Sequence, residues 1–89
     1  MTVRKRVRAH GRVQGVFFRD TLRRAAAREG VAGWAANRSD GTVEAVLEGE
    51  ADAVDRLVEL CRSGPGHAAV DRLDVADEEP EGLGGFEIR

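Results

Sequence analysis

The chain has very little cysteine, proline or aromatic residue, and it has no long hydrophobic run. Its 89 residues include one Cys, two Pro, three Phe, one Trp and no Tyr. Because Cys61 has no second cysteine to pair with, no internal disulfide is possible, and we expect a cytoplasmic location. The longest apolar stretches span only a few residues, as at 16–18, whereas a membrane helix needs about 20. The basic start at 1–6 lacks the apolar block of a secretory signal.

The residues needed for several common kinds of catalysis are missing as well. No Gly-x-x-x-x-Gly-Lys-Ser/Thr motif is present, and nothing resembles a Ser-His-Asp set. His10 and His67 have no Cys, Asp or Glu at metal-ligand spacing, so we predict no metal and no other cofactor. Cys61 lies on the apolar side of a predicted helix, and the sixth residue after it is His67, not Arg. We therefore predict a buried thiol, not a phosphatase nucleophile.

What is present suits one small globular domain. Hydrophobic residues make up 42% of the chain and charged residues 34%, and no linker or repeat interrupts residues 1–89. At this length the chain forms one domain and is too short for two.

The charges are distributed unevenly. Residues 1–30 carry a net charge of +7 and residues 31–89 carry −9, for a total of −2. The basic half could attract an anionic ligand or a nucleic acid. Alternatively, the two halves could neutralise each other across neighbouring strands of one sheet, and we favour this second interpretation.

Hydrophobic periodicity predicts two helices and five strands. Alternating apolar and basic residues predict a first strand with one buried face, and apolar residues spaced three and four apart predict the two helices. The expected order is strand 3–13, helix 19–29, strand 31–37, strand 42–48, helix 51–62, strand 70–75 and a short strand at 86–88. This βαββαβ order, with its extra strand, predicts an α+β fold of the ferredoxin-like, split βαβ type. Such a fold has an antiparallel sheet with both helices on one face.

The segment between the first strand and the first helix, GRVQGVFFR at 11–19, could bind an anion. Gly11 and Gly15 permit backbone conformations that other residues avoid, and they allow a ligand to approach closely. A loop entering a helix offers free N–H groups to an oxyanion, and Arg19 could grip two phosphate oxygens. By spacing alone, an ordinary loop with a solvated arginine remains an equal alternative.

A second informative segment is GWAANRSDGTV at 33–43. Asn37 stands where the second strand meets a hairpin turn at Asp40-Gly41. Taken alone, Asn37 more often bonds the turn backbone, although its amide could also orient a water molecule. Thr42 either supports Asn37 or merely favours the strand. We expect Trp34 to serve packing.

Together, GRVQGVFFR at 11–19 and GWAAN at 33–37, followed by GTV at 41–43, resemble the paired signatures of acylphosphatases. The resemblance covers nearly the whole chain, because its length, its element order and Gly64-Pro65 after the second helix also fit that family. It implies the ferredoxin-like fold and the metal-independent hydrolysis of a carboxyl-phosphate anhydride to a carboxylate and inorganic phosphate.

The resemblance also assigns residues to roles. It implies that Arg19 binds the phosphoryl group, that Asn37 positions the attacking water, and that Gly11, Gly41 and Thr42 support the site. Backbone N–H groups of the loop would share the phosphate, those of Gln14, Gly15, Val16, Phe17 and Phe18. A carboxylate leaving group, whose conjugate acid has a pKa of about 4, departs without a general acid. The absence of catalytic His and of paired carboxylates is therefore consistent with this chemistry.

Two other functions are compatible with parts of the sequence. The same fold serves RNA binding, but the basic-Gly-aromatic RNA signature is absent and few aromatic residues could stack on bases. The chain could also be an accessory domain like the first domain of larger carbamoyl-phosphate-handling maturation proteins, although it lacks their cysteine-rich zinc motifs. We expect a small acyl phosphate as the substrate, no nucleic-acid or membrane partner, and a monomer.

Overall fold

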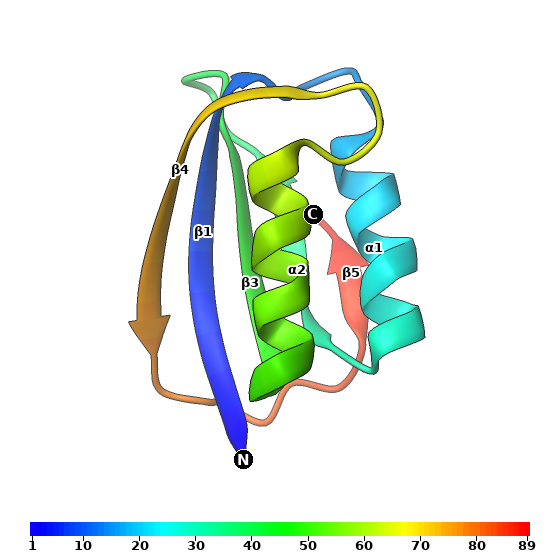
Figure 1. Ribbon diagram of the computed structural model, residues 1–89, viewed down its shortest axis with the longest axis vertical. Coiled ribbons are helices and arrows are strands. Elements are labelled where there is room, and N and C mark those ends of the chain that lie inside the picture. The colour runs from blue at the N-terminus through cyan, green and yellow to red at the C-terminus, as the bar shows by residue number, and fades with distance from the viewer.

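A five-stranded sheet, covered on one face by two helices, forms the protein in the computed structural model, which describes residues 1–89 (Figure 1). The elements follow in the order β1 (Thr2–Arg12), α1 (Phe18–Glu29), β2 (Ala32–Asn37), β3 (Val43–Glu50), α2 (Ala51–Ser63), β4 (Ala69–Glu78) and β5 (Phe86–Ile88). This order confirms the predicted α+β, ferredoxin-like plan.

The sheet is mixed, which corrects the prediction of a wholly antiparallel one. Its strand order is β4-β1-β3-β2-β5, and the pairs among the first four strands are antiparallel, whereas β5 runs parallel to β2. After β4, the segment 79–85 crosses to the opposite edge of the sheet (Figure 1). β5 therefore starts at the same end as β2 and is held there by bonds such as Arg89 N–H to the Ala35 carbonyl, at 2.8 Å.

Several element boundaries differ from the prediction by one to three residues. Helix α1 begins one residue early and α2 ends one residue late, whereas β2 and β3 each begin one residue late. Strand β4 is longer than predicted at both ends, because it pairs with β1 from Ala69 to Glu78. Most of its side chains are exposed, so its apolar pattern could not reveal its length.

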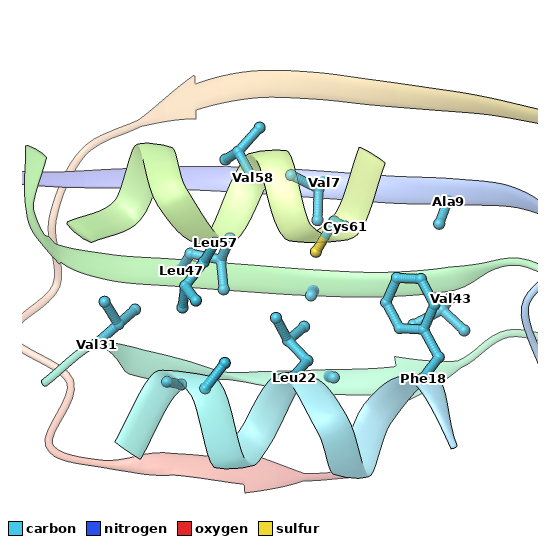
Figure 2. Close-up of a cluster of buried hydrophobic side chains, with 14 of the residues drawn as sticks. Val7, Ala9, Phe18, Leu22, Val31, Val43, Leu47, Leu57, Val58 and Cys61 are labelled. Carbon is cyan, nitrogen blue, oxygen red and sulfur yellow. The ribbon is translucent and has the colours of Figure 1, made fainter. Parts of the chain in front are cut away.

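The main core lies between the sheet and the helices. Helix α1 contributes Phe18, Leu22, Ala25 and Ala26, and α2 contributes Ala53, Val54, Leu57, Val58 and Cys61. Figure 2 shows Phe18, the first residue of α1, among these core side chains. Cys61 is fully buried in this core, which confirms the predicted buried thiol, and this burial raises the pKa of the thiol to about 12.

The sheet face opposite the helices is less exposed than the alternation in the sequence predicted. Glu44 and Glu48 do point to this face, as expected, but they are only 8% and 4% exposed, and Arg4 is 5% exposed. Glu48 is covered by the segment 79–85, whose backbone N–H groups bond to its carboxylate. Glu44 is instead surrounded by the arginines that pair with it. Arginines of β1 pair with acids of β3 and β4, as the charge distribution predicted.

One end of the sheet collects three connections that are far apart in the sequence. The β1–α1 loop at 13–17, the β2–β3 hairpin at 38–42 and the α2–β4 segment at 64–68 all lie at the top of Figure 1. Strand β5 points toward the same end. None of the helices is both long enough and apolar enough to span a membrane.

Candidate active site

A hollow of about 270 Å³ opens beside the β1–α1 loop, at the end of the sheet where the three connections gather. It is lined by Val13, Gly15, Phe17, Phe18, Arg19, Asp20, Asn37 and Ile88. The hollow thus brings together Arg19 from α1 and Asn37 from β2, the two residues predicted to be catalytic. Among the other predicted site residues, Gly15, Phe17 and Phe18 line it, whereas Gly11, Gln14, Val16, Gly41 and Thr42 do not.

The β1–α1 loop has a backbone shape that leaves its N–H groups free. Gly15 and Phe17 both adopt left-handed conformations, with φ of 70° and 64°. Phe17 is the N-cap of α1 and makes no side-chain capping bond. The backbone N–H groups of residues 14–17 donate no hydrogen bond within the protein. Such a set of free N–H groups at the positive end of a helix suits an oxyanion.

The loop is fixed in place by contacts on both sides. The Gln14 side-chain amide donates to the carbonyls of Arg38, at 2.7 Å, and of Thr42, at 3.0 Å. The Val16 carbonyl accepts the N–H of His67 at 3.0 Å. Gln14 and Val16 therefore act behind the hollow, tying the loop to the β2–β3 hairpin and to the α2–β4 segment. Gly11 lies at a β-bulge between β1 and β4.

No Asp or Glu side chain pairs with Arg19. Its one hydrogen bond runs from Nη1 to the backbone oxygen of Arg89, at 3.5 Å. The neighbouring carboxylate of Asp20 is already bound by Arg23, at 2.6 Å, and by Arg24, at 3.0 Å. A cation in the first turn of a helix is disfavoured by the helix dipole, so an anion bound beside Arg19 would relieve an electrostatic conflict.

The Asn37 side chain is exposed and makes no hydrogen bond within the protein, so its amide does not serve the turn. Asp40 does that instead: its Oδ1 accepts the Thr42 hydroxyl at 2.6 Å and the Thr42 N–H at 3.0 Å. These two bonds lower the pKa of the Asp40 carboxyl. The sequence left open that Asn37 bonds the turn and that Thr42 supports Asn37. The structure shows no side-chain hydrogen bond for either role. Gly41, with φ of 90°, completes this turn.

Sequence reasoning missed three residues of the lining: Val13, Asp20 and Ile88. Val13 is the last residue of the strand predicted over 3–13, and in the structure it is buried just after β1. Ile88 reaches the hollow because β5 pairs with β2 in parallel, which places Ile88 opposite Ala35, near Asn37. Only knowledge of that pairing could have found it. No group of three or more His, Cys, Asp or Glu side chains lies in an arrangement that could hold a metal ion.

Comparison with known proteins identifies the family. The family model for acylphosphatase matches residues 5–88. An acylphosphatase of Rubrobacter xylanophilus is 58% identical over 99% of this chain and 81% of its own length. The structure of a Coxiella burnetii acylphosphatase superposes with a TM-score of 0.93 at 36% identity, over 99% of this chain and 93% of that one. The Bacillus subtilis acylphosphatase structure gives 0.92 at 36% identity, over 100% and 99%. The resemblance noted in the sequence is therefore confirmed, and the chain belongs to the acylphosphatase family, a family of hydrolases.

Proposed function

We propose that this enzyme hydrolyses acyl phosphates at the described hollow, with Arg19 and the β1–α1 loop binding the phosphoryl group and Asn37 holding the attacking water. The observation that carries the proposal is the conjunction of an unpaired cation, Arg19, with the free N–H groups of residues 14–17 beside one hollow. These groups complement a dianionic phosphoryl group in shape and in charge.

Arg19 and the loop N–H groups supply what a phosphoryl transition state chiefly needs. Charge in that transition state spreads over three equatorial oxygens, and position plus electrostatic stabilisation account for most of the catalysis. Because Gln14 and Val16 fix the loop before substrate arrives, its donors need little reorganisation. A guanidinium adds two donors in a planar fork that can engage two phosphate oxygens.

Asn37 supplies the remaining element, a site for water. Its amide offers both a donor and an acceptor, and neither is used by another protein group. In the proposed reaction the water oxygen forms a bond to phosphorus while the bond from phosphorus to the acyl oxygen breaks. The products are a carboxylate and inorganic phosphate. The carboxylate leaves unprotonated, since its conjugate acid has a pKa of about 4, and the proton of the water passes to a phosphate oxygen of the substrate.

The test is hydrolysis of benzoyl phosphate in oxygen-18-labelled water with EDTA present. We expect rapid turnover with the label found in inorganic phosphate and none in benzoate. Label in benzoate would show attack at the carbonyl carbon and would overturn the proposed role of Asn37. No turnover by a folded protein would overturn the proposal as a whole, and nucleic-acid binding would then be the next function to measure.

The absence of a protein base is tested separately by the pH dependence of the rate. With proton transfer to the substrate itself, the pH profile of kcat should show no ionisation of a protein base near neutrality. A protein pKa in that region, shifted or abolished in a single variant, would contradict the substrate-assisted step while leaving the phosphate site intact.

A further inference from the structure

The substrate of the proposed reaction has two halves, and the contacts described so far account for only one. The phosphoryl half is bound by Arg19 and the loop, whereas the acyl half is attached directly to it through one oxygen atom. The acyl half therefore begins within a few ångströms of the phosphorus, beside the rest of the same hollow. The side chains that line this remainder decide which acyl groups fit.

That remainder is apolar, and it is exposed without a partner. Four large hydrophobic residues of the whole chain are exposed, and two of them, Phe17 at 67% and Ile88 at 37%, line this one hollow. They come from different elements, the N-cap of α1 and the edge strand β5. Two buried residues, Val13 and Phe18, complete the apolar part of the lining. A single exposed apolar residue is ordinary, but two that line the same hollow form a patch that a ligand could cover.

Phe17 is held in place at a conformational cost. It is the one residue other than glycine with a positive φ, at 64°, a conformation that bulky side chains avoid. Its ring meets the ring of His67 edge-on, with centroids 6.2 Å apart. Gly66 permits this approach, since a Cβ at that position would lie 2.6 Å from the Val16 carbonyl oxygen. A glycine would serve the loop backbone better than Phe17, so the ring itself has a use.

The charges of the lining also favour an uncharged acyl group. Arg19 is its one cation, and in the proposed function the phosphoryl group engages it. Asp20 is its one acid, bound to Arg23 and Arg24. An acyl group with its own carboxylate or phosphate would find no second cation in this lining and would lie near the Asp20 carboxylate.

We propose that Phe17 and Ile88 form an apolar platform for the acyl group, which makes this enzyme selective for acyl phosphates with apolar, and above all aromatic, acyl groups. The inference rests on the proposed function, because it concerns the other half of the same substrate. An aromatic acyl group would pack against the Phe17 ring, while the small acyl group of acetyl phosphate would gain little from it.

The test compares benzoyl phosphate with acetyl phosphate in the parent protein and in Phe17→Gly. Glycine keeps the left-handed backbone without strain and removes the ring. Because each substrate is compared with itself, its intrinsic reactivity cancels, and any damage to the loop lowers both rates alike. We expect kcat/KM for benzoyl phosphate to fall about threefold to tenfold more than kcat/KM for acetyl phosphate. Ile88→Ala, on a different element, should change the ratio in the same direction.

Val75→Ala provides the matched control, since Val75 is another exposed hydrophobic residue and lies outside the hollow. It should leave the ratio of the two substrates unchanged. Inhibition constants give a readout independent of turnover. In Phe17→Gly the inhibition constant of phenylphosphonate should rise about threefold to tenfold more than that of inorganic phosphate.

The possible failures are distinguishable. In one outcome the parent turns over both substrates, and each variant, Phe17→Gly and Ile88→Ala, loses the same factor of kcat/KM for benzoyl phosphate as for acetyl phosphate. That outcome would overturn the acyl platform and leave the proposed function intact. Turnover of neither substrate by the folded parent would overturn both. A preference for an acyl phosphate that carries a carboxylate, such as succinyl phosphate over benzoyl phosphate, would also contradict the platform.

Discussion

Two regions of this small protein use arginine in opposite ways. On the sheet face opposite the helices, Arg4, Arg6, Glu44, Glu48 and Glu78 form a cluster of paired charges, which we call the open-face network. At the other region, the hollow beside the β1–α1 loop, Arg19 pairs with no Asp or Glu side chain and donates to the backbone oxygen of Arg89 at 3.5 Å. The same side chain is neutralised in one place and left unpaired in the other.

The open-face network is structural. Arg4 is buried, and its Nε donates to Glu78 at 2.9 Å while its Nη1 lies 3.5 Å from Glu48. The Glu48 carboxylate also accepts three backbone N–H bonds, from Glu81, Gly82 and Leu83, at 2.8 to 2.9 Å. It thereby fixes the segment that leads to β5. Every charge of the network thus has an opposite charge within ion-pair distance, although the buried Nη1 of Arg4 makes no hydrogen bond.

The comparison shows that charge pairing, more than charge itself, separates scaffold from site in this chain. The basic first strand suggested anion or nucleic-acid binding from the sequence, yet Arg4 and Arg6 are occupied by acids of β3 and β4. Arg12, Arg19 and Arg28 pair with no Asp or Glu side chain, and of these three only Arg19 lines the hollow. Substitutions in the two regions should therefore differ in kind.

The largest effect is expected for Arg19→Ala. Loss of the unpaired guanidinium should lower kcat/KM for benzoyl phosphate by about 10³-fold, because it removes the cation aimed at the developing phosphoryl charge. Its unfolding midpoint in urea should not fall, since no ion pair is lost. Arg24→Ala, on the same helix, is the control and should leave kcat/KM unchanged. A comparable loss of kcat/KM in both variants would show that the overall positive charge of the helix matters, and not a contact made by Arg19 itself.

Asn37→Ala should have the next largest effect, a fall in kcat of about 10²-fold with little change in KM, if the amide positions water in the transition state. Steady-state kinetics on benzoyl phosphate measure both constants. Ser39→Ala, in the adjoining turn, is the control. Circular dichroism of Asn37→Ala should match the parent, and a loss of structure as large as the loss of rate would indicate a turn-bonding role instead.

In the open-face network the expected change is one of stability. Glu48→Gln removes the buried charge that faces Arg4 and weakens three N–H bonds, so the unfolding free energy should fall by about 2 kcal/mol. Urea denaturation followed by circular dichroism measures it. The variant should keep most of its kcat/KM at temperatures where it remains folded. A selective loss of kcat without a loss of stability would place Glu48 in the catalytic machinery.

The network also predicts how stability responds to acid. Backbone N–H bonds, the first from Glu81, lower the pKa of Glu48, and hydrogen bonds from Arg6 and Arg4 lower the pKa of Glu78. A carboxyl whose pKa is lower in the folded state stabilises the fold above its unfolded pKa, near 4.3, and loses that contribution as the pH falls through its folded pKa. The unfolding free energy should therefore be level above about pH 5 and should decline below it.

Glu48→Gln should make this decline shallower. Urea unfolding at a series of pH values below neutrality, in the parent and the variant, measures the difference. Equal slopes in the two proteins would show that Glu48 does not titrate at a lowered pKa in the folded state.

The smallest effect is expected for Glu29→Gln, the same substitution as Glu48→Gln at a surface site. The Glu29 carboxylate is held by Arg56 on α2, at 2.8 and 3.1 Å, but both side chains reach solvent. Solvent screens such a pair and offsets most of its attraction. The urea midpoint should shift far less than in Glu48→Gln. Equal shifts would mean that burial does not separate the two carboxylates.

The sequence revealed the fold more completely than it revealed the site. Period-two and helical patterns located every element, although β4 came out too short because most of its side chains are exposed. The direction of β5 was not readable, since three residues carry no signal of their pairing partner. For the same reason Ile88 was missed as part of the hollow. The two motifs did direct attention to Arg19 and Asn37, but only the structure showed that Asp40, not Asn37, bonds the turn.

The most direct test of the division between scaffold and site measures the unfolding free energy with and without inorganic phosphate, the product. A ligand that binds the folded state at ten times its Kd stabilises it by about 1.4 kcal/mol. We predict this increase for the parent and for Glu48→Gln, although the unfolding free energy of Glu48→Gln without phosphate should be lower. For Arg19→Gln we predict the parent's unfolding free energy without phosphate, and only a small increase when phosphate is added. Full stabilisation of Arg19→Gln by phosphate, or its loss in Glu48→Gln, would contradict the account.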